Sequence, residues 1–207
     1  QQKRLKNIFM NTTYTKMSID EILKCLKEDL NPERYEHSIG VAEMAEQLAK
    51  RFGCDPEKAY IAGLLHDCAK CMDFELSKKI AREHTPDLDE TEKDNKKTIH
   101  APVSAWLAKD KYGVDDPEIL SAIRLHTIGK CMMSDFEKII FIADKIEHRT
   151  REVEFREQIE KYLDEENPLD KAMFKSFEMT IESLVKRKLP ICFVTVNVYN
   201  EMLEKIK

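Results

Sequence analysis

The sequence predicts an all-α fold, because helix start and stop signals recur along the chain while strand patterns are scarce. Hydrophobic residues make up 42% of the 207 residues, and there are only 5 glycines and 7 prolines. This composition is typical of a folded, helix-rich domain and differs from that of disordered chains. The length suffices for one domain with a sizeable core.

Polar caps mark the expected helix starts. Ser18-Ile-Asp-Glu21 and Ser134-Asp-Phe-Glu137 have the capping-box pattern, in which the serine and the glutamate satisfy free amides of the first turn. Asp55-Pro56-Glu57 and Asp116-Pro117-Glu118 place a cap before a proline at the first helical position. We therefore expect one helix to begin at each of these four segments.

Apolar residues at helical spacing predict how far the helices extend. One helix runs from about Pro32 to Phe52 and is closed by Gly53. The helix that opens at Asp55 is expected to run through Lys70, and the one that opens at Asp116 to end near Thr127. Further helical spacing covers Glu152 to Tyr162, Leu169 to Lys188 and Val198 to Ile206.

Three segments do not follow this helical pattern. Residues 84–98 are polar and contain Pro86, which predicts a surface loop. Ile191 to Val198 carries enough β-branched and aromatic residues to predict a short strand. Residues 1–17 are basic-polar and weakly patterned. We expect them to form an N-terminal extension outside the core, and residues 18–207 to form the functional domain.

Charge and cysteine content argue against several classes of protein. The net charge is −5 and basic residues are interspersed with acidic ones, so we expect no nucleic-acid partner. No apolar run reaches membrane-spanning length and no signal-peptide core is visible, so we expect no membrane partner. The six cysteines form no framework, which predicts reduced thiols in the cytoplasm. Cys68-Ala-Lys-Cys71 lacks a second pair, and we interpret its spacing as without function.

Ionisable residues interrupt apolar helices at three places. His66-Asp67 ends an apolar run that begins at Ala59, and Asp144 ends another that begins at Ile139. His37 falls on or beside the apolar side of its own helix. An unpaired buried charge is costly, so these residues need a compensating partner. One divalent cation bound by imidazole nitrogens and carboxylate oxygens would compensate all three.

Taken singly, each of these residues has an ordinary structural interpretation. A His-Asp pair is common by chance, and a partly buried His37 would simply hydrogen-bond to backbone. Asp144 would serve as a capping or salt-bridging residue. The ordered set is much rarer, and His100 before Ala101-Pro102 and His126-Thr127 at a helix end extend it to four of the six histidines. This conjunction predicts a metal site inside a helical bundle.

These residues carry a resemblance to a known family. The pattern resembles the HD superfamily, whose metal-binding signature is H…HD…D, and within it the YqeK-type symmetrical bis(5'-nucleosyl)-tetraphosphatases. The resemblance extends from about Ile19 to beyond Leu184. The matching stretches are Arg34 to Ser38, Gly63 to Lys70, His100 to Val103, Ala122 to Thr127 and Lys138 to Glu147.

The resemblance implies an HD-domain helical bundle and assigns roles to its residues. The implied metal ligands are His37, His66, Asp67 and Asp144. The ion is expected to be iron, with manganese, cobalt or nickel as alternatives. The implied catalytic residues are Asp67, which would orient or deprotonate the attacking water, and Lys70. The implied substrate contacts are Arg34, Lys70, His100, His126 and Thr127, of which His100 and His126 would otherwise hold a second metal ion.

The implied activity is the symmetric cleavage of a dinucleoside polyphosphate such as diadenosine tetraphosphate into two nucleoside diphosphates. The alternatives are an HD-domain nucleotidase acting on a mononucleotide and a non-catalytic nucleotide-sensing module. The sequence departs from the family after Glu147, where His148-Arg149-Thr150 replaces the usual proline and downstream arginine. Whether Arg149 or Arg151 contacts substrate is therefore left open, and a homodimer is one option for the oligomeric state.

Overall fold

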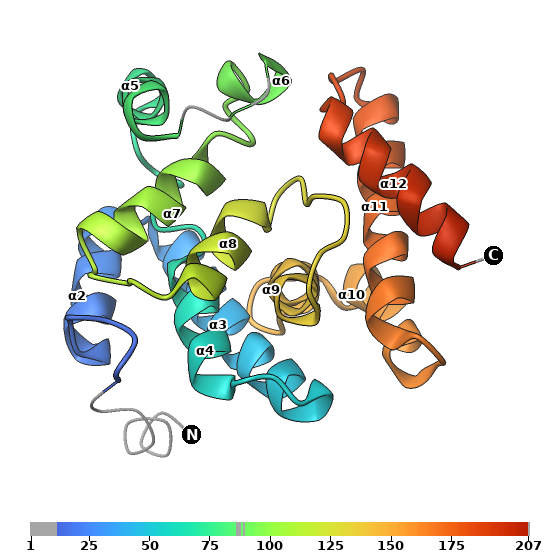
Figure 1. The fold of residues 1–207 in the computed structure, drawn as a ribbon, viewed down its shortest axis with the longest axis horizontal. Helices are drawn as coiled ribbons and strands as arrows, with labels where there is room; N and C mark the ends of the chain where they lie inside the picture. The colour runs from blue at the N-terminus through green and yellow to red at the C-terminus, as the bar shows by residue number, and fades with distance from the viewer. Residues whose placement is uncertain (1–11, 86–87, 89, 207) are drawn as a thin grey trace.

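The computed structural model describes residues 12–85, 88 and 90–206, and these residues form α-helices and one 3-10 turn without a strand (Figure 1). The all-α prediction is confirmed. In chain order the helices are α2 (Ile19–Asp29), α3 (Pro32–Phe52), α4 (Pro56–Leu65), α5 (Phe74–His84), α6 (Glu90–Lys93), α7 (His100–Asp110), α8 (Pro117–Leu125), α9 (Asp135–Ile146), α10 (Val153–Glu160), the 3-10 helix η1 (Lys161–Asp164), α11 (Pro168–Lys186) and α12 (Phe193–Lys205).

The predicted caps begin the helices as expected. Ser18 and Ser134 each form a complete capping box at the start of α2 and α9. The side chains of Asp55 and Asp116 accept hydrogen bonds from first-turn amides of α4 and α8. Gly53 ends α3 in the left-handed conformation with φ of 76°, which glycine adopts without a steric penalty. Local sequence signals therefore determine where these helices begin and end.

The central helices are α3, α4, α8 and α9, whose inward faces supply most of the main hydrophobic core. α3 and α4 lie against each other in the middle of the molecule (Figure 1). They approach so closely that a Cβ atom on Gly63 would lie 2.8 Å from the Cα atom of Ala42. A side chain at Gly63 would force the two backbones apart, so glycine is required for this contact.

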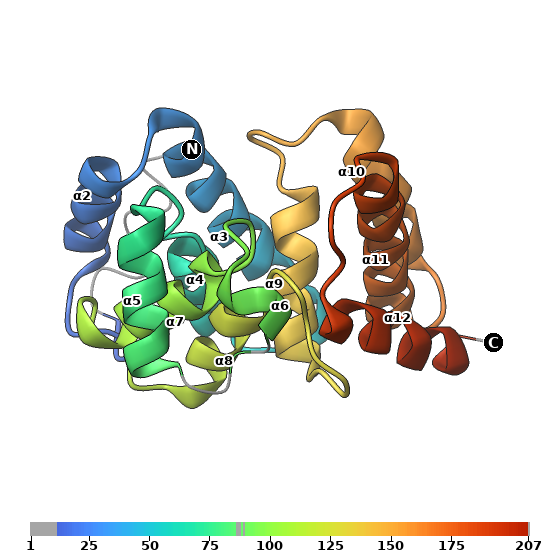
Figure 2. The ribbon, with the colours of Figure 1, turned by 90° about the horizontal axis from the view of Figure 1, so that it is seen from above.

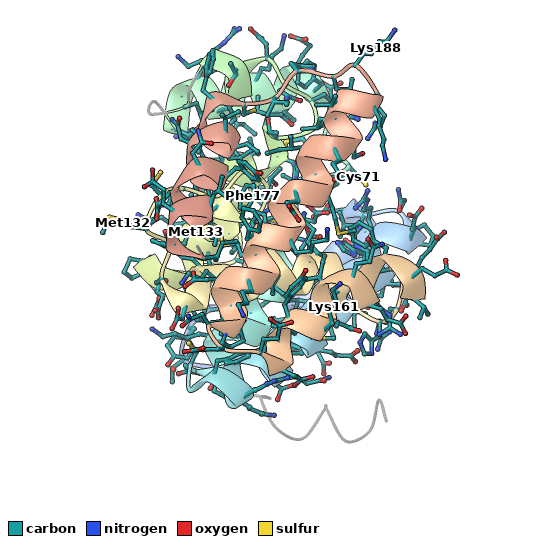
Figure 3. All side chains as sticks on the ribbon, turned by 90° about the vertical axis from the view of Figure 1, so that its right-hand side faces the viewer. Cys71, Met132, Met133, Lys161, Phe177 and Lys188 are labelled. Carbon is teal, nitrogen blue, oxygen red and sulfur yellow. The ribbon has the colours of Figure 1, made fainter. Side chains whose placement is uncertain are left out.

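The remaining helices lie on two sides of this centre. α2, α5 and α7 lie on one side, α10, α11 and α12 lie on the other, and α6 lies between them (Figure 2). α11 is attached through Phe177, whose ring stacks on Phe141 of α9 with centroids 4.9 Å apart. Figure 3 shows α11 and α12 crossing that face, with Met132 at its edge, 80% exposed. Within the described residues, no helix combines the length and apolar character needed to span a membrane.

Three predicted segments differ from the structure. The strand predicted over Ile191 to Val198 is wrong: α12 begins at Phe193, because buried Thr195, Val198 and Met202 recur at helical spacing. The helix predicted through Lys70 ends at Leu65, and residues 66–72 form successive turns. The predicted loop over 84–98 contains the short helix α6, and residues 86, 87 and 89 lie outside the described residues.

Part of the predicted N-terminal extension also lies outside the described residues, namely residues 1–11. The hydroxyl of Tyr14 donates a hydrogen bond to the Asp55 cap of α4 over 2.8 Å. The backbone N–H of Lys16 donates to the carbonyl oxygen of Tyr112 over 3.3 Å. Residues 12–17 therefore contact the helices that follow them.

Candidate metal centre and adjoining cavity

The four predicted metal ligands come together from three helices. His37 lies inside α3, His66 and Asp67 lie in the turn after α4, and Asp144 lies in the last turn of α9; all four are buried. Nε2 of His37 lies 2.9 Å from Oδ1 of Asp144, and Nε2 of His66 lies 3.8 Å from the same oxygen. Single atoms of His37, His66 and Asp67 lie within 4.8 Å of one another.

Two further buried histidines face Asp67 from the opposite wall. His100 is the first residue of α7, and His126 is the C-cap of α8. Nε2 of His100 lies 3.1 Å from Oδ1 of Asp67, and Nε2 of His126 lies 3.4 Å from it. The Thr127 hydroxyl lies 3.0 Å from Nε2 of His126. One carboxylate is therefore shared by two groups of imidazoles.

The electrostatics keep four of these side chains in the forms that bind metal ions, and His37 is the exception. Burial alone would lower the pKa of His37, but hydrogen bonds with Asp144 and Glu147 raise it overall, so metal binding there displaces a proton. Burial lowers the pKa of His66 to about 3 and that of His100 to about 4, so both imidazoles are neutral at neutral pH. Burial alone would raise the pKa of Asp144, but Lys145, Arg151 and His37 together hold it well below its usual range. The pKa of Asp67 is also held well below its usual range, because the surrounding imidazoles and Lys70 outweigh its burial. Neutral imidazole and ionised carboxylate are the ligand forms.

Two buried polar atoms at the centre lack an ordinary partner. Among the described residues, Nε2 of His66 and Oδ1 of Asp67 are inaccessible to solvent and make no hydrogen bond of normal geometry. Buried polar atoms are almost always satisfied, so both atoms call for a ligand. A mixed set of imidazole nitrogens and carboxylate oxygens suits a first-row divalent ion. The residues present therefore fit a metal ion.

A cavity of 590 Å³ opens beside the centre and has two chemically different walls. Its cationic wall lies next to the ligand cluster and comprises Arg34, Lys70, Lys145 and Arg151. Its apolar wall lies in the segment after α4 and at the start of α7 and comprises Ala69, Met72, Phe74 and Ile99. Lys96 and Lys97 also line the cavity. The cavity can thus take a ligand with an anionic part and a flat apolar part.

All five residues predicted to contact substrate line this cavity. Nη1 of Arg34 lies 3.3 Å from Oδ2 of Asp67, and Nζ of Lys70 lies 2.9 Å from Nε2 of His100. Burial lowers the pKa of Lys70, although Asp67 and Asp144 partly oppose this shift. Arg34 and Lys70 thus place two cations beside the shared carboxylate.

The turn that follows α9 places Arg149 and Arg151 in different surroundings. Arg151 lines the cavity, and its guanidinium donates to Asp144. Arg149 does not line the cavity and pairs with Glu36 and Glu43 of α3. The sequence alone did not reveal which arginine lines the cavity, because this depends on the conformation of the turn that carries both.

Sequence reasoning did not assign a role to Lys145, Phe74 or Glu147. Lys145 directly follows a predicted ligand, and its Nζ donates to Asp144 over 2.6 Å. Phe74 carried no signal, since it reads as an ordinary apolar residue of α5. Glu147 lay within the recognised motif, and it is fully buried next to His37. Of the two spaced cysteines, Cys68 is buried and Cys71 is exposed, and both are free thiols.

Comparison with known proteins places the chain in a family. The HD domain family model matches residues 34–149. A Bacillus subtilis protein named bis(5'-nucleosyl)-tetraphosphatase, symmetrical, is 40% identical over 187 residues, which cover 89% of this chain and 97% of the relative. A Staphylococcus aureus protein of the same name is 34% identical over 194 residues, covering 92% and 99%.

A solved structure has the same fold. The crystal structure of a Clostridium acetobutylicum protein, described as a predicted HD superfamily hydrolase involved in NAD metabolism, matches with a TM-score of 0.85 and 36% identity. The match covers 91% of this chain and 98% of that one. The HD family implies a divalent metal ion, which agrees with the buried ligand cluster. The chain belongs to the HD domain family and, within it, to the symmetrical bis(5'-nucleosyl)-tetraphosphatases, a family of hydrolases.

Proposed function

We propose that this protein hydrolyses dinucleoside polyphosphates of the diadenosine tetraphosphate type in the middle of the phosphate chain, releasing two nucleoside diphosphates. The observation that carries the proposal is the cavity, where a cationic wall adjoins a buried metal-ligand cluster and an apolar wall lies beyond it. The names of the relatives support the same substrate class.

His37, His66, Asp67 and Asp144 are proposed to hold the metal ion. When bound, a divalent ion supplies Lewis-acid chemistry, since it polarises a phosphoryl oxygen and lowers the pKa of water. The imidazole and carboxylate donors favour iron, with manganese, cobalt or nickel as substitutes.

His100 and His126 have two possible roles, binding a second metal ion or recognising phosphate, and replacing His126 by alanine distinguishes them. Loss of part of the metal content supports a second ion, and full metal content with weaker substrate binding supports phosphate recognition.

Asp67 is proposed to orient the attacking water and to accept its proton. One of its oxygens, Oδ1, faces His100 and His126 without a hydrogen bond of normal geometry, while Oδ2 lies 3.3 Å from Arg34. Lys70 lies 3.6 Å from Oδ1 and is proposed to neutralise the charge that develops on the leaving phosphate. Arg34, Lys145 and Arg151 are proposed to bind the remaining phosphate oxygens.

The apolar wall is proposed to receive one nucleobase. Ile99 belongs to a small hydrophobic cluster with buried Ala69 and Val103, and Met72 and Phe74 pack against this cluster. Phe74 lines the cavity, and Nζ of Lys78 lies 4.9 Å from the centre of its ring. A planar base gains both hydrophobic contact and stacking from such a surface.

The point of cleavage is tested with diadenosine tetraphosphate in oxygen-18 water. The water oxygen bonds to one inner phosphorus, and the oxygen that bridges the two inner phosphorus atoms leaves with the other half. Each turnover then yields one labelled and one unlabelled ADP, so half of the ADP carries the label. ATP and AMP as the main products would contradict symmetric cleavage. Rapid hydrolysis of a mononucleotide with no cleavage of the dinucleotide would instead favour the nucleotidase alternative.

A further inference from the structure

Two of the buried histidines are oriented by the ends of their own helices. Nδ1 of His66 lies 2.6 Å from the carbonyl oxygen of Gly63, and Nδ1 of His126 lies 2.7 Å from that of Ile123. Each histidine is the C-cap residue of its helix. The carbonyl groups of a last helical turn have no intrahelical partner, so they are free to accept a proton from Nδ1. This contact leaves the lone pair on Nε2, the atom that faces the centre.

His37 cannot be oriented in this way because it lies inside the long helix α3. The carbonyl groups around it are engaged in helical hydrogen bonds. Its Nδ1 instead lies 3.1 Å from Oε1 of Glu147, while its Nε2 faces Asp144. Glu147 is the C-cap residue of α9 and follows Asp144 by three positions. The end of α9 therefore contacts both nitrogens of the same ring.

The turn after α9 holds the Glu147 carboxylate in place. The backbone N–H of Arg149 donates to Oε2 over 2.6 Å, and that of Thr150 donates over 3.1 Å. The Thr150 hydroxyl also donates to Oε1. Because the side chain is fully buried and held by several donors, it is a rigid acceptor for His37.

Gly40, one helical turn after His37, provides the space for this carboxylate. A Cβ atom at Gly40 would lie 2.2 Å from Oε2 and 2.9 Å from Cδ of Glu147. Glycine is disfavoured inside helices relative to alanine, so its position here has a steric reason. The carboxylate occupies the space that a side chain at Gly40 would fill.

We propose that Glu147, seated over Gly40, is the positioning residue for His37. It accepts the Nδ1 proton, which fixes the tautomer with the lone pair on Nε2, and it holds the ring plane toward the metal site. As a carboxylate it also increases the electron donation from Nε2 beyond what a backbone carbonyl achieves. This inference rests on the proposed metal site and is independent of the nucleotide that is cleaved.

The test measures the affinity of the metal-free protein for Co²⁺ alone and the visible absorption of bound Co²⁺. Glu147→Ala should weaken Co²⁺ binding by about 10- to 100-fold and change the absorption bands. Glu147→Gln should restore part of the affinity, because its amide oxygen can still accept from Nδ1. Restoration is partial, since its amide N–H groups would face the N–H donors of Arg149 and Thr150. Ser38→Ala, next to His37 but without a polar contact to it, is the control and should bind Co²⁺ as the wild type does.

The role of Gly40 is tested in two backgrounds. Gly40→Ala should weaken Co²⁺ binding in the wild type, because the new Cβ displaces the carboxylate. In the Glu147→Ala background the same substitution should leave Co²⁺ affinity unchanged, since the nearest atom outside the Glu147 carboxylate, the Arg149 Cβ, lies 3.3 Å away. Equal losses in both backgrounds would show that Gly40 acts by another route.

Two other outcomes separate this inference from the metal site itself. Wild-type affinity and spectrum in Glu147→Ala would overturn the positioning role while leaving the metal site intact. Failure of the wild-type protein to bind Co²⁺ would overturn both.

Discussion

The guanidinium of Arg151 donates to the Oδ1 carboxylate oxygen and to the carbonyl oxygen of Asp144, both over 2.8 Å. These contacts bring Arg151 to the edge of the metal-ligand cluster, from where it lines the cavity. Arg149, two positions earlier, does not line the cavity and instead pairs with Glu36 and Glu43. The two arginines therefore form a matched pair for mutagenesis.

Arg151→Ala should lower kcat/KM for the dinucleotide even when enough metal is supplied to saturate the site, a condition needed because Arg151 also contacts the proposed ligand Asp144. A charge-assisted contact to phosphate is typically worth about 1.5 to 3 kcal/mol, which corresponds to roughly a ten- to hundredfold loss. Arg34→Ala and Lys70→Ala should behave in the same way, because both side chains lie beside Asp67 and line the cavity. Arg149→Ala is the control and should keep wild-type kinetics. Equal losses for Arg149→Ala and Arg151→Ala would contradict the proposed phosphate wall.

His66→Ala and Asp67→Ala should each abolish both metal binding and turnover. Metal content per chain and the rate of dinucleotide cleavage are the measurements. Cys71→Ser, at an exposed position of the same segment, should keep both. Asp67→Ala should also lower the free energy of unfolding of the metal-free protein only modestly. The loss should be smaller than the roughly 2 to 5 kcal/mol that is typical when a large aliphatic core residue is replaced by alanine. Full metal occupancy in Asp67→Ala would remove it from the ligand set.

Phe74→Ala should weaken product binding at the apolar wall. Stacking of a base on an aromatic ring is worth about 1 to 3 kcal/mol in alanine substitutions, and ADP inhibition measures this loss. Leu76→Ala is the matched control, because Leu76 lies on the same helix and is 46% exposed. If the two variants bound ADP equally well, the base would lie elsewhere.

Asp116→Asn should reduce the sensitivity of the metal-free protein to acid. Burial alone would raise the pKa of Asp116, but Lys58 at 2.7 Å and the amides of Ile119 and Glu118 lower it overall. A lowered folded-state pKa stabilises the fold above the unfolded value of about 3.9, and this stability is lost as the pH falls through the folded value. Asparagine keeps the cap without titrating.

Urea unfolding at several pH values measures this effect. Near neutral pH the wild type should be more stable than Asp116→Asn by roughly 0.2 to 1 kcal/mol, the usual value of a surface ion pair. The difference should narrow as the pH falls below about 4. A difference that stayed constant with pH would mean that the carboxylate does not titrate differently in the folded state.

The members of the buried His/Asp cluster could be selected from the sequence because burial and charge conflict within a single segment. His66-Asp67 and Asp144 each stand at the end of an apolar run, and the hydrophobic pattern alone placed them in the interior. Gly53 and the four polar caps were predictable for a similar reason, since each acts on its own helix. Such signals are local and do not depend on tertiary packing.

The features that could not be predicted depend on contacts between segments. Arg151 faces the cavity because the turn after α9 directs it there, and no pattern in residues 147–151 specifies that direction. The β-branched residues near Val198 favoured a strand, but packing against α11 stabilises a helix. The role of Glu147 could not be predicted, because it depends on which residue lies next to it in space. Only the structure shows that its carboxylate lies over Gly40 on another helix.

The contact between Gly63 and Ala42 determines the spacing of two of the proposed metal ligands, His37 and His66. It lies about one turn from His66 and between one and two turns from His37, so two touching backbones set the spacing of these imidazoles. Two backbones in contact can shift less than a layer of side chains can. We therefore expect the distance between the two imidazoles to stay constant when residues elsewhere are replaced. The apolar wall, in contrast, consists of exchangeable side chains such as Met72 and Phe74. Substitutions in the apolar wall therefore leave untouched the backbone contact that sets the spacing of the two imidazoles.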